Sequence, residues 1–240
     1  TRSQLLRVFF TLKPGWAQAA QHLLADVAGR ILRNLRFFSP RQCVRLFVAL
    51  QPPEAIVQAL EHVALGAAQR FGGRASRPET LHLTLAFLGA VAPEALSAVD
   101  AACRVAAGDV RLAGGFVLQL DGLARWGHKR LIWAGCGTIP GTLPELADAL
   151  RARLELAGLA VAGEHAFTPH LTLVRRVGTR VPASAEACAQ LLAEICPAGL
   201  PAWPVRELVL VESHLHAGGP EHRVLATYPL GGEASAASCS

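Results

Sequence analysis

The 240-residue sequence contains no methionine and lacks several motifs that assign chains to common protein classes. No run approaches the roughly 18 uncharged apolar residues of a membrane-spanning helix, so we expect no membrane segment. No G-x-x-x-x-G-K-[S/T] phosphate loop occurs, and nothing indicates ATP hydrolysis. The six cysteines form no C-x-x-C pair, so we expect no structural zinc site. We interpret them as thiols of a reducing compartment, the cytoplasm.

The composition is that of a folded chain, with 52% hydrophobic and 17% charged residues. Such a chain can bury a sizeable core, which excludes disorder as the dominant state. The net charge of +5 is unevenly distributed, because residues 1–43 carry +6 and residues 44–240 carry −1. The basic balance is therefore weak evidence that the main domain binds a polyanion.

Residues 1–43 stand apart from the rest of the chain. Because methionine is absent, we expect either that the sequence is a fragment or that residues 1–43 lie upstream of the translation start, with Val44, directly before the first clear strand, as a candidate start. A strand-and-helix pattern within it also echoes the pattern that follows Val44, and a partial duplication is the alternative interpretation. We expect the main domain to span residues 44–230, and residues 231–240 to form a flexible tail.

Strand-like and helix-like segments alternate from residue 45 to residue 228. This alternation predicts a sheet protein of the α+β or α/β class. The runs at 116–120 and 131–134 are expected to be neighbouring strands around a turn. The expected strands are 45–50, 81–88, 116–120, 131–134, 169–174, 207–211 and 223–228, and the expected helices are 54–70, 93–107, 143–156 and 183–195.

The string His-Leu-Thr-Leu occurs twice, at residues 82–85 and 170–173. Side chains of a strand alternate between its faces, so each string buries its leucines and presents a His and a Thr to the opposite face. A single His-x-Thr is expected by chance in a chain of this composition, but two copies of the full string are not. Two similar lobes facing each other across a groove would bring the two histidines together.

Two imidazoles across a groove suit the cleavage of a phosphodiester. With a reference pKa of about 6.5, one ring can accept a proton from water while the other donates a proton to the leaving oxygen. A Thr hydroxyl two residues after each His can donate a hydrogen bond to a non-bridging phosphate oxygen. This chemistry requires no metal, and we expect neither a metal nor a cofactor.

The paired strings resemble the two H-x-T/S-x motifs of the 2H phosphoesterase superfamily. Together with the runs at 45–50, 82–89 and 169–175, they make the chain similar to the RNA 2′,3′-cyclic phosphodiesterases, a family first called 2′-5′ RNA ligase. The likeness covers residues 44–230. It implies an α+β fold of two pseudo-symmetric lobes of antiparallel sheet backed by helices, with the active groove between the sheets.

The resemblance also implies a reaction and the roles of four residues. The terminal 2′,3′-cyclic phosphate of an RNA would be hydrolysed to a 2′-phosphomonoester. His82 would donate a proton to the leaving 3′ oxygen, and His170 would be the base that activates water. Thr84 and Thr172 would bind phosphate oxygens. A weak, ATP-independent ligation of the cyclic phosphate end to a 5′-hydroxyl is implied as well.

Further residues are candidates for contacts with the substrate. The resemblance places Arg175 near the phosphate and Phe87 at a position that stacks on the terminal base. Arg130 is expected to contact the substrate from a basic turn, and Trp126 beside that turn is a candidate for lining the groove. A local cluster of basic residues flanking the motif strands would bind RNA: Arg125, Lys129, Arg130, Arg175 and Arg176.

Other interpretations remain open. The H-x-H pair His214 and His216, with His222, is a weaker candidate for a metal site. The chain could instead be a nucleotide-binding module without catalysis, or a cyclic phosphodiesterase of small nucleotides or 2′-5′ oligonucleotides. Sequence does not separate these substrates, since all require the same four groups. We expect a monomer whose partner is an RNA end or a small nucleotide bearing a 2′,3′-cyclic phosphate.

Overall fold

The computed structural model describes residues 43–162, 167–178, 184–217 and 219–231. Predictions for residues 1–42 and for the tail beyond residue 231 lie outside these ranges. Within them, no helix is long and apolar enough to cross a lipid bilayer.

Most of the strands form one antiparallel sheet, in the order β10-β9-β1-β3-β7-β6-β5, with β2 added at β7. The bounds of these strands are β1 (Val44–Leu50), β2 (Arg74–Ala75), β3 (Leu83–Val91), β5 (Gly122–Trp126), β6 (Leu131–Gly135), β7 (Leu171–Arg175), β9 (Glu207–His216) and β10 (Gly219–Pro229). A separate antiparallel pair joins β4 (Phe116–Leu118) to β8 (Trp203–Val205).

The large sheet has two halves that meet at its centre. β3 and β7 are in register at Leu83 and Leu171. On one side of this junction lie β10, β9, β1 and β3, and on the other lie β7, β6 and β5. The two predicted lobes are thus the two halves of one sheet.

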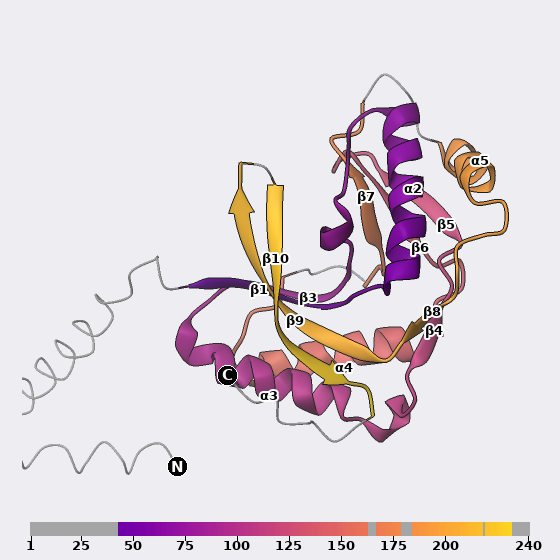
Figure 1. Cartoon of the computed structure of the whole chain (residues 1–240). Helices are drawn as coiled ribbons and strands as arrows, with labels where there is room; N and C mark the ends of the chain where they lie inside the picture. The colour runs from indigo at the N-terminus through magenta and orange to yellow at the C-terminus, as the bar shows by residue number, and fades with distance from the viewer. Residues whose placement is uncertain (1–42, 163–166, 179–183, 218, 232–240) are drawn as a thin grey trace, which may run out of the picture. The chain divides into compact units, whose positions relative to one another are not determined.

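Each half is backed by its own pair of helices (Figure 1). α2 (Glu54–Phe71) packs on β7 and on α5 (Ala185–Ile195), which contacts β5. α3 (Leu96–Ala107) contacts β9 and β10, and α4 (Thr142–Leu156) contacts α3 and β3. The α+β fold of antiparallel sheet backed by helices is therefore confirmed. Because α2 follows β1 but covers the other half, neither half is a continuous segment of the chain.

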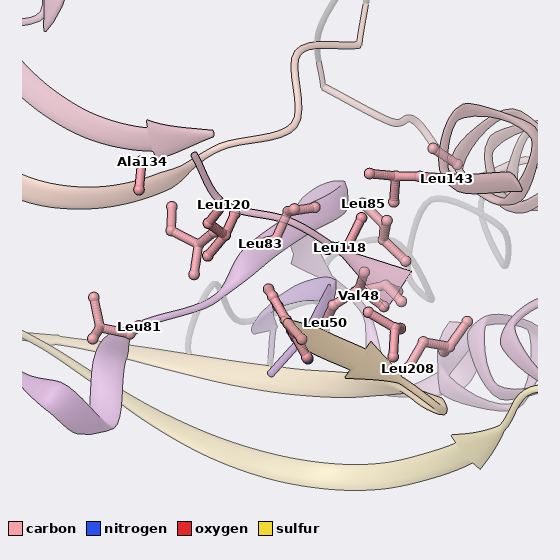
Figure 2. Packing of buried hydrophobic residues seen from close by; sticks show 14 of the residues in the cluster. Val48, Leu50, Leu81, Leu83, Leu85, Leu118, Leu120, Ala134, Leu143 and Leu208 are labelled. Atoms are coloured by element: carbon pink, nitrogen blue, oxygen red, sulfur yellow. The ribbon is translucent and has the colours of Figure 1, made fainter. Parts of the chain in front are cut away.

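The core lies between the sheet and the helices, and the alternation of side chains along β1 and β3 determines which residues enter it. Val48, Leu50, Leu83 and Leu85 all point into this cluster (Figure 2). The intervening Phe47 belongs to a small second cluster on the opposite face of the sheet. The leucines of the first string are buried as predicted, so the polar residues of that string are left to the other face.

One predicted pairing of strands is wrong. The segments at 116–120 and 131–134 are not neighbours, because β4 pairs with β8 and the partner of β6 is β5. The β5 run Gly-Leu-Ala-Arg-Trp contains no β-branched residue, so it gives a weak strand signal. β4 and its partner β8 lie more than 80 residues apart along the chain, and local pattern does not reveal such a pairing.

Replacement of Leu83 tests how much packing at the junction of the two halves contributes to the stability of the fold. Its side chain is fully buried. We expect Leu83→Ala to reduce the free energy of unfolding by about 2–5 kcal/mol, because a buried cavity is left. The matched control is Leu156→Ala on α4, where the side chain is 86% exposed and the change is expected to stay within about 0.5 kcal/mol. Urea unfolding measures the free energy of unfolding of both variants, provided that its dependence on urea concentration is unchanged. Equal losses of stability in the two variants would contradict this packing.

Candidate active site

A cavity of about 460 Å³ opens on the face of the sheet opposite the core, where the two halves meet. His82 and Thr84 line it from one half, and His170 and Thr172 line it from the other. The two strings, 88 residues apart in sequence, thus contribute their polar residues to one cavity. Each His lies directly before its strand, since β3 begins at Leu83 and β7 begins at Leu171.

The same backbone hydrogen bond orients both histidines. Nδ1 of His82 lies 2.7 Å from the carbonyl oxygen of Thr80, and Nδ1 of His170 lies 2.8 Å from the carbonyl oxygen of Thr168. A carbonyl oxygen only accepts, so Nδ1 carries the proton in each ring. Nε2 is then the nitrogen that each neutral ring offers, unprotonated, to the shared cavity.

Aromatic side chains pack against each imidazole. The ring of Phe47 lies 4.6 Å from the ring of His82, and the ring of Trp126 lies 4.4 Å from that of His170, measured between centroids. Two cations lie over neighbouring rings, since the guanidinium of Arg45 is 4.6 Å from Phe87 and Nζ of Lys129 is 4.4 Å from Trp126. The two halves therefore provide similar surroundings, each with an imidazole, an aromatic ring and a cation.

The remaining predicted site residues fall into two groups. Phe87 and Arg175 line the cavity, as do Trp126 and Lys129. Arg130 does not line it. Its Nε donates to the carbonyl of Val177 at 3.1 Å, and the amide of Val177 donates to the carbonyl of Arg130 at 2.9 Å. Arg130 thus ties the β5–β6 turn to the segment after β7, and the neighbouring Lys129 faces the cavity instead.

Comparisons with known proteins agree with this geometry. Residues 51–217 match the family model of the 2′-5′ RNA ligase superfamily. Over 134 residues the chain is 37% identical to a protein of Escherichia coli (strain K12) named RNA 2′,3′-cyclic phosphodiesterase, covering 55% of this chain and 71% of the relative. A protein of the same name from Thermus thermophilus is 32% identical over 203 residues, covering 79% of this chain and 92% of the relative. The crystal structure of E. coli LigT complexed with 3′-AMP has a TM-score of 0.62 and 26% identity, covering 78% of this chain and 98% of that one.

The chain belongs to the 2′-5′ RNA ligase superfamily. The resemblance drawn from the two strings is thereby confirmed. The family match begins after β1 and ends within the β9–β10 hairpin, so it includes both strings, whereas cavity residues such as Phe47 and His222 lie outside it.

The sequence did not predict that the β9–β10 hairpin lines the cavity of this superfamily member. Ser213 and His222 are partners across the hairpin, and both line the cavity. The ring of His222 meets the ring of His82 edge-on, with centroids 5.0 Å apart. Alternation along β9 alone would place Ser213 and Leu215 on the same face of the sheet. That His222 lies on this face too depends on how β9 and β10 pair, which local pattern does not give.

The three hairpin histidines do not share one site. His214 pairs with Glu212 at 3.2 Å, and His216 pairs with Glu221 at 3.4 Å, whereas His222 lines the cavity. Across the described ranges, no group of three or more His, Cys, Asp or Glu side chains is placed to hold a metal ion.

The cavity disfavours positive charge on its histidines. Burial lowers the pKa of His82 to about 4, against the opposing effect of its hydrogen bond to Thr80, and His222 and Arg175 lower it further. Burial, followed by the charges of Lys129 and Arg175, also lowers the pKa of His170. At pH 7 both rings of the free site are therefore neutral.

An anion in the cavity should reverse this effect. We expect inorganic phosphate to raise the pKa of His82 and of His170, because a negative charge nearby favours the imidazolium. Without phosphate, both rings should be mostly neutral at pH 6.5, the ordinary pKa of a histidine side chain, because each pKa lies below that value. NMR pH titration of the protein with ¹⁵N-labelled histidine measures both values. Titrations of the two rings that do not depend on phosphate would contradict an anion site between them.

Proposed function

We propose that this protein hydrolyses the terminal 2′,3′-cyclic phosphodiester of RNA to a 2′-phosphomonoester, without a metal or a cofactor. The observation that carries the proposal is the paired geometry of His82 and His170. Each ring has Nδ1 fixed by a backbone carbonyl and leaves Nε2 to one cavity. The relatives named RNA 2′,3′-cyclic phosphodiesterase support the same substrate class.

The reaction is an acid–base displacement at phosphorus. A water molecule attacks the phosphorus atom and gives a proton to Nε2 of His170. The bond between phosphorus and the ribose 3′ oxygen breaks, and that oxygen takes a proton from Nε2 of His82. The water thus supplies the new phosphate oxygen, and its proton stays on His170 while His82 has given one up, so the two rings together keep the same number of protons. His170 then releases its proton to solvent, and His82 takes up a new one when the next cyclic phosphate binds. The ribose keeps the phosphate on its 2′ oxygen, which defines the product.

The cavity provides the electrostatic part of this mechanism. The Thr84 and Thr172 hydroxyls donate to the non-bridging oxygens and hold phosphorus between the two rings. Arg175 supplies positive charge for the developing dianion. Because the described residues of the lining include Arg45, Lys129 and Arg175 and no carboxylate, the cavity favours an anion.

The low pKa of His82 fits a general acid that becomes protonated only when the substrate binds. In the free cavity burial keeps the ring neutral, so Nε2 of His82 carries no proton at pH 7. The anionic cyclic phosphate favours the imidazolium and raises that pKa once it is bound. Proton uptake by His82 is then coupled to binding of the correct charge. We place this reaction in the cytoplasm, with the protein acting as a monomer.

Replacement of either His tests the assignment. We expect His82→Ala and His170→Ala each to reduce kcat by at least about 10²-fold, the contribution of a positioned acid or base. The matched control is His214→Ala, because that ring pairs with Glu212 and does not line the cavity. Urea unfolding of each variant checks the fold. Near-normal turnover by a folded His170→Ala variant would contradict its role as the base.

The position of the phosphate in the product shows which of the two ribose oxygens leaves phosphorus. The protein is incubated with a short RNA ending in a 2′,3′-cyclic phosphate in the presence of EDTA, and the product is resolved against 2′- and 3′-phosphate standards. We expect only the 2′-phosphate, because the 3′ oxygen leaves. A 3′-phosphate product would reverse the assignment of the leaving oxygen, and activity lost in EDTA would contradict a reaction without a metal.

A further inference from the structure

A second, smaller cavity of about 150 Å³ adjoins the active site. Thr80, Arg175 and Pro220 line both cavities, so the two spaces share a wall. Thr80 is also the residue whose carbonyl orients His82. The small cavity therefore begins next to the atoms that hold the proposed acid.

The lining of this second cavity, here named the arginine cavity, is strongly basic. It is formed by short segments in and around β2, β7 and β10, and none of the described residues that line it carries a carboxylate. One of its arginines, Arg77, pairs with Glu79 at 3.2 Å and donates to the carbonyl of Pro220, which ties it to the hairpin. The arginines that line the cavity are Arg74, Arg77, Arg175 and Arg176.

The backbone conformation after β7 and the pairing of β2 with β7 bring these arginines together. In a continuing strand, Arg175 and Arg176 would point to opposite faces. Arg176 instead adopts a left-handed conformation with φ of +58°, which breaks the alternation directly after β7, and both residues line the arginine cavity. A left-handed non-glycine residue is uncommon, and here it brings Arg176 into the same lining as Arg175. Arg74 pairs in register with Arg175, and a Cβ on the neighbouring Gly73 would lie only 2.6 Å from the Arg175 carbonyl oxygen.

We propose that this cavity binds the internucleotide phosphate on the 5′ side of the terminal nucleotide of an RNA. This inference rests on the proposed function, because it assumes that the cyclic phosphate lies between His82 and His170. The terminal ribose then carries the cyclic phosphate on one side and the 5′ phosphate of the chain on the other. The 5′ phosphate therefore lies in a cavity next to the active site. An arginine guanidinium can donate two parallel hydrogen bonds to two oxygens of one phosphate, so the arginine cavity suits it.

The consequence is a preference for substrate class. A nucleoside 2′,3′-cyclic phosphate has no 5′ phosphodiester, so it fills the active site and leaves the arginine cavity without a ligand. An RNA end fills both. The arginine cavity thereby selects RNA ends over small cyclic nucleotides, a choice that the catalytic groups alone do not make.

Arg176→Asn tests this selection. Asn tolerates a left-handed backbone, so the variant removes the charge without a new strain. The two substrates are cytidine 2′,3′-cyclic phosphate and a trinucleotide ending in the same group. We expect the ratio of kcat/KM for the trinucleotide to that for the mononucleotide to fall about tenfold, as for loss of one charge-assisted contact. The logarithmic salt slope for the trinucleotide should also become shallower by about one.

Arg130→Asn is the matched control. Arg130 also has a positive φ, of 51°, but it lines neither cavity. This variant should leave the ratio between the two substrates unchanged. An unchanged ratio in Arg176→Asn, or an equal fall in both variants, would overturn the assignment of the arginine cavity.

The proposed function and this inference fail in different ways. If the wild-type protein hydrolyses neither substrate, the proposed function fails. The affinities of cytidine 2′-phosphate and of the trinucleotide ending in a 2′-phosphate, measured by calorimetry, then test the cavity alone. Tighter binding of the trinucleotide, lost in Arg176→Asn, supports the inference. Equal binding of the two ligands overturns it.

Discussion

Two hydrogen bonds from imidazole Nδ1 to a backbone carbonyl determine what the rest of this site can do. They join His82 to Thr80 and His170 to Thr168, in each case two residues back along the chain. A side chain rotates, but a backbone carbonyl held by neighbouring structure does not. Because each bond fixes both the ring and its tautomer, Nε2 of both histidines is directed to the same task, and the threonines and Arg175 act around that arrangement.

The fold keeps these carbonyls in place. Both histidines precede their strands rather than lying within them, so the two residues before each ring lie outside β3 and β7. Prolines stiffen these approaches, with Pro78 opening the turn before His82 and Pro169 lying next to His170. Directly after each ring, a fully buried leucine, Leu83 or Leu171, enters the core at the junction of the two half-sheets.

Much of this site can be predicted from the sequence, and the exceptions have physical causes. The alternation within the two strings predicts which residues are buried and which face the cavity, and the duplication indicates the family. The place of His222 depends on hairpin register, and that of Arg130 on a bond to Val177 on another segment, so neither follows from local pattern. The orienting carbonyls are equally hidden, because every residue has one. The pairing of β4 with β8 joins distant parts of the chain, so local pattern does not reveal it either.

The tautomer of the two rings is the most direct test of this account. Long-range ¹H–¹⁵N correlation spectra of the free protein with labelled histidine, recorded at pH 7, distinguish a protonated ring nitrogen from an unprotonated one. We expect His82 and His170 both to be neutral, with the proton on Nδ1 and Nε2 unprotonated. The spectra of the Ala variants assign the two rings. A neutral ring of either histidine with the proton on Nε2 and an unprotonated Nδ1 would contradict the orienting hydrogen bonds. It would also contradict the acid–base roles that depend on them.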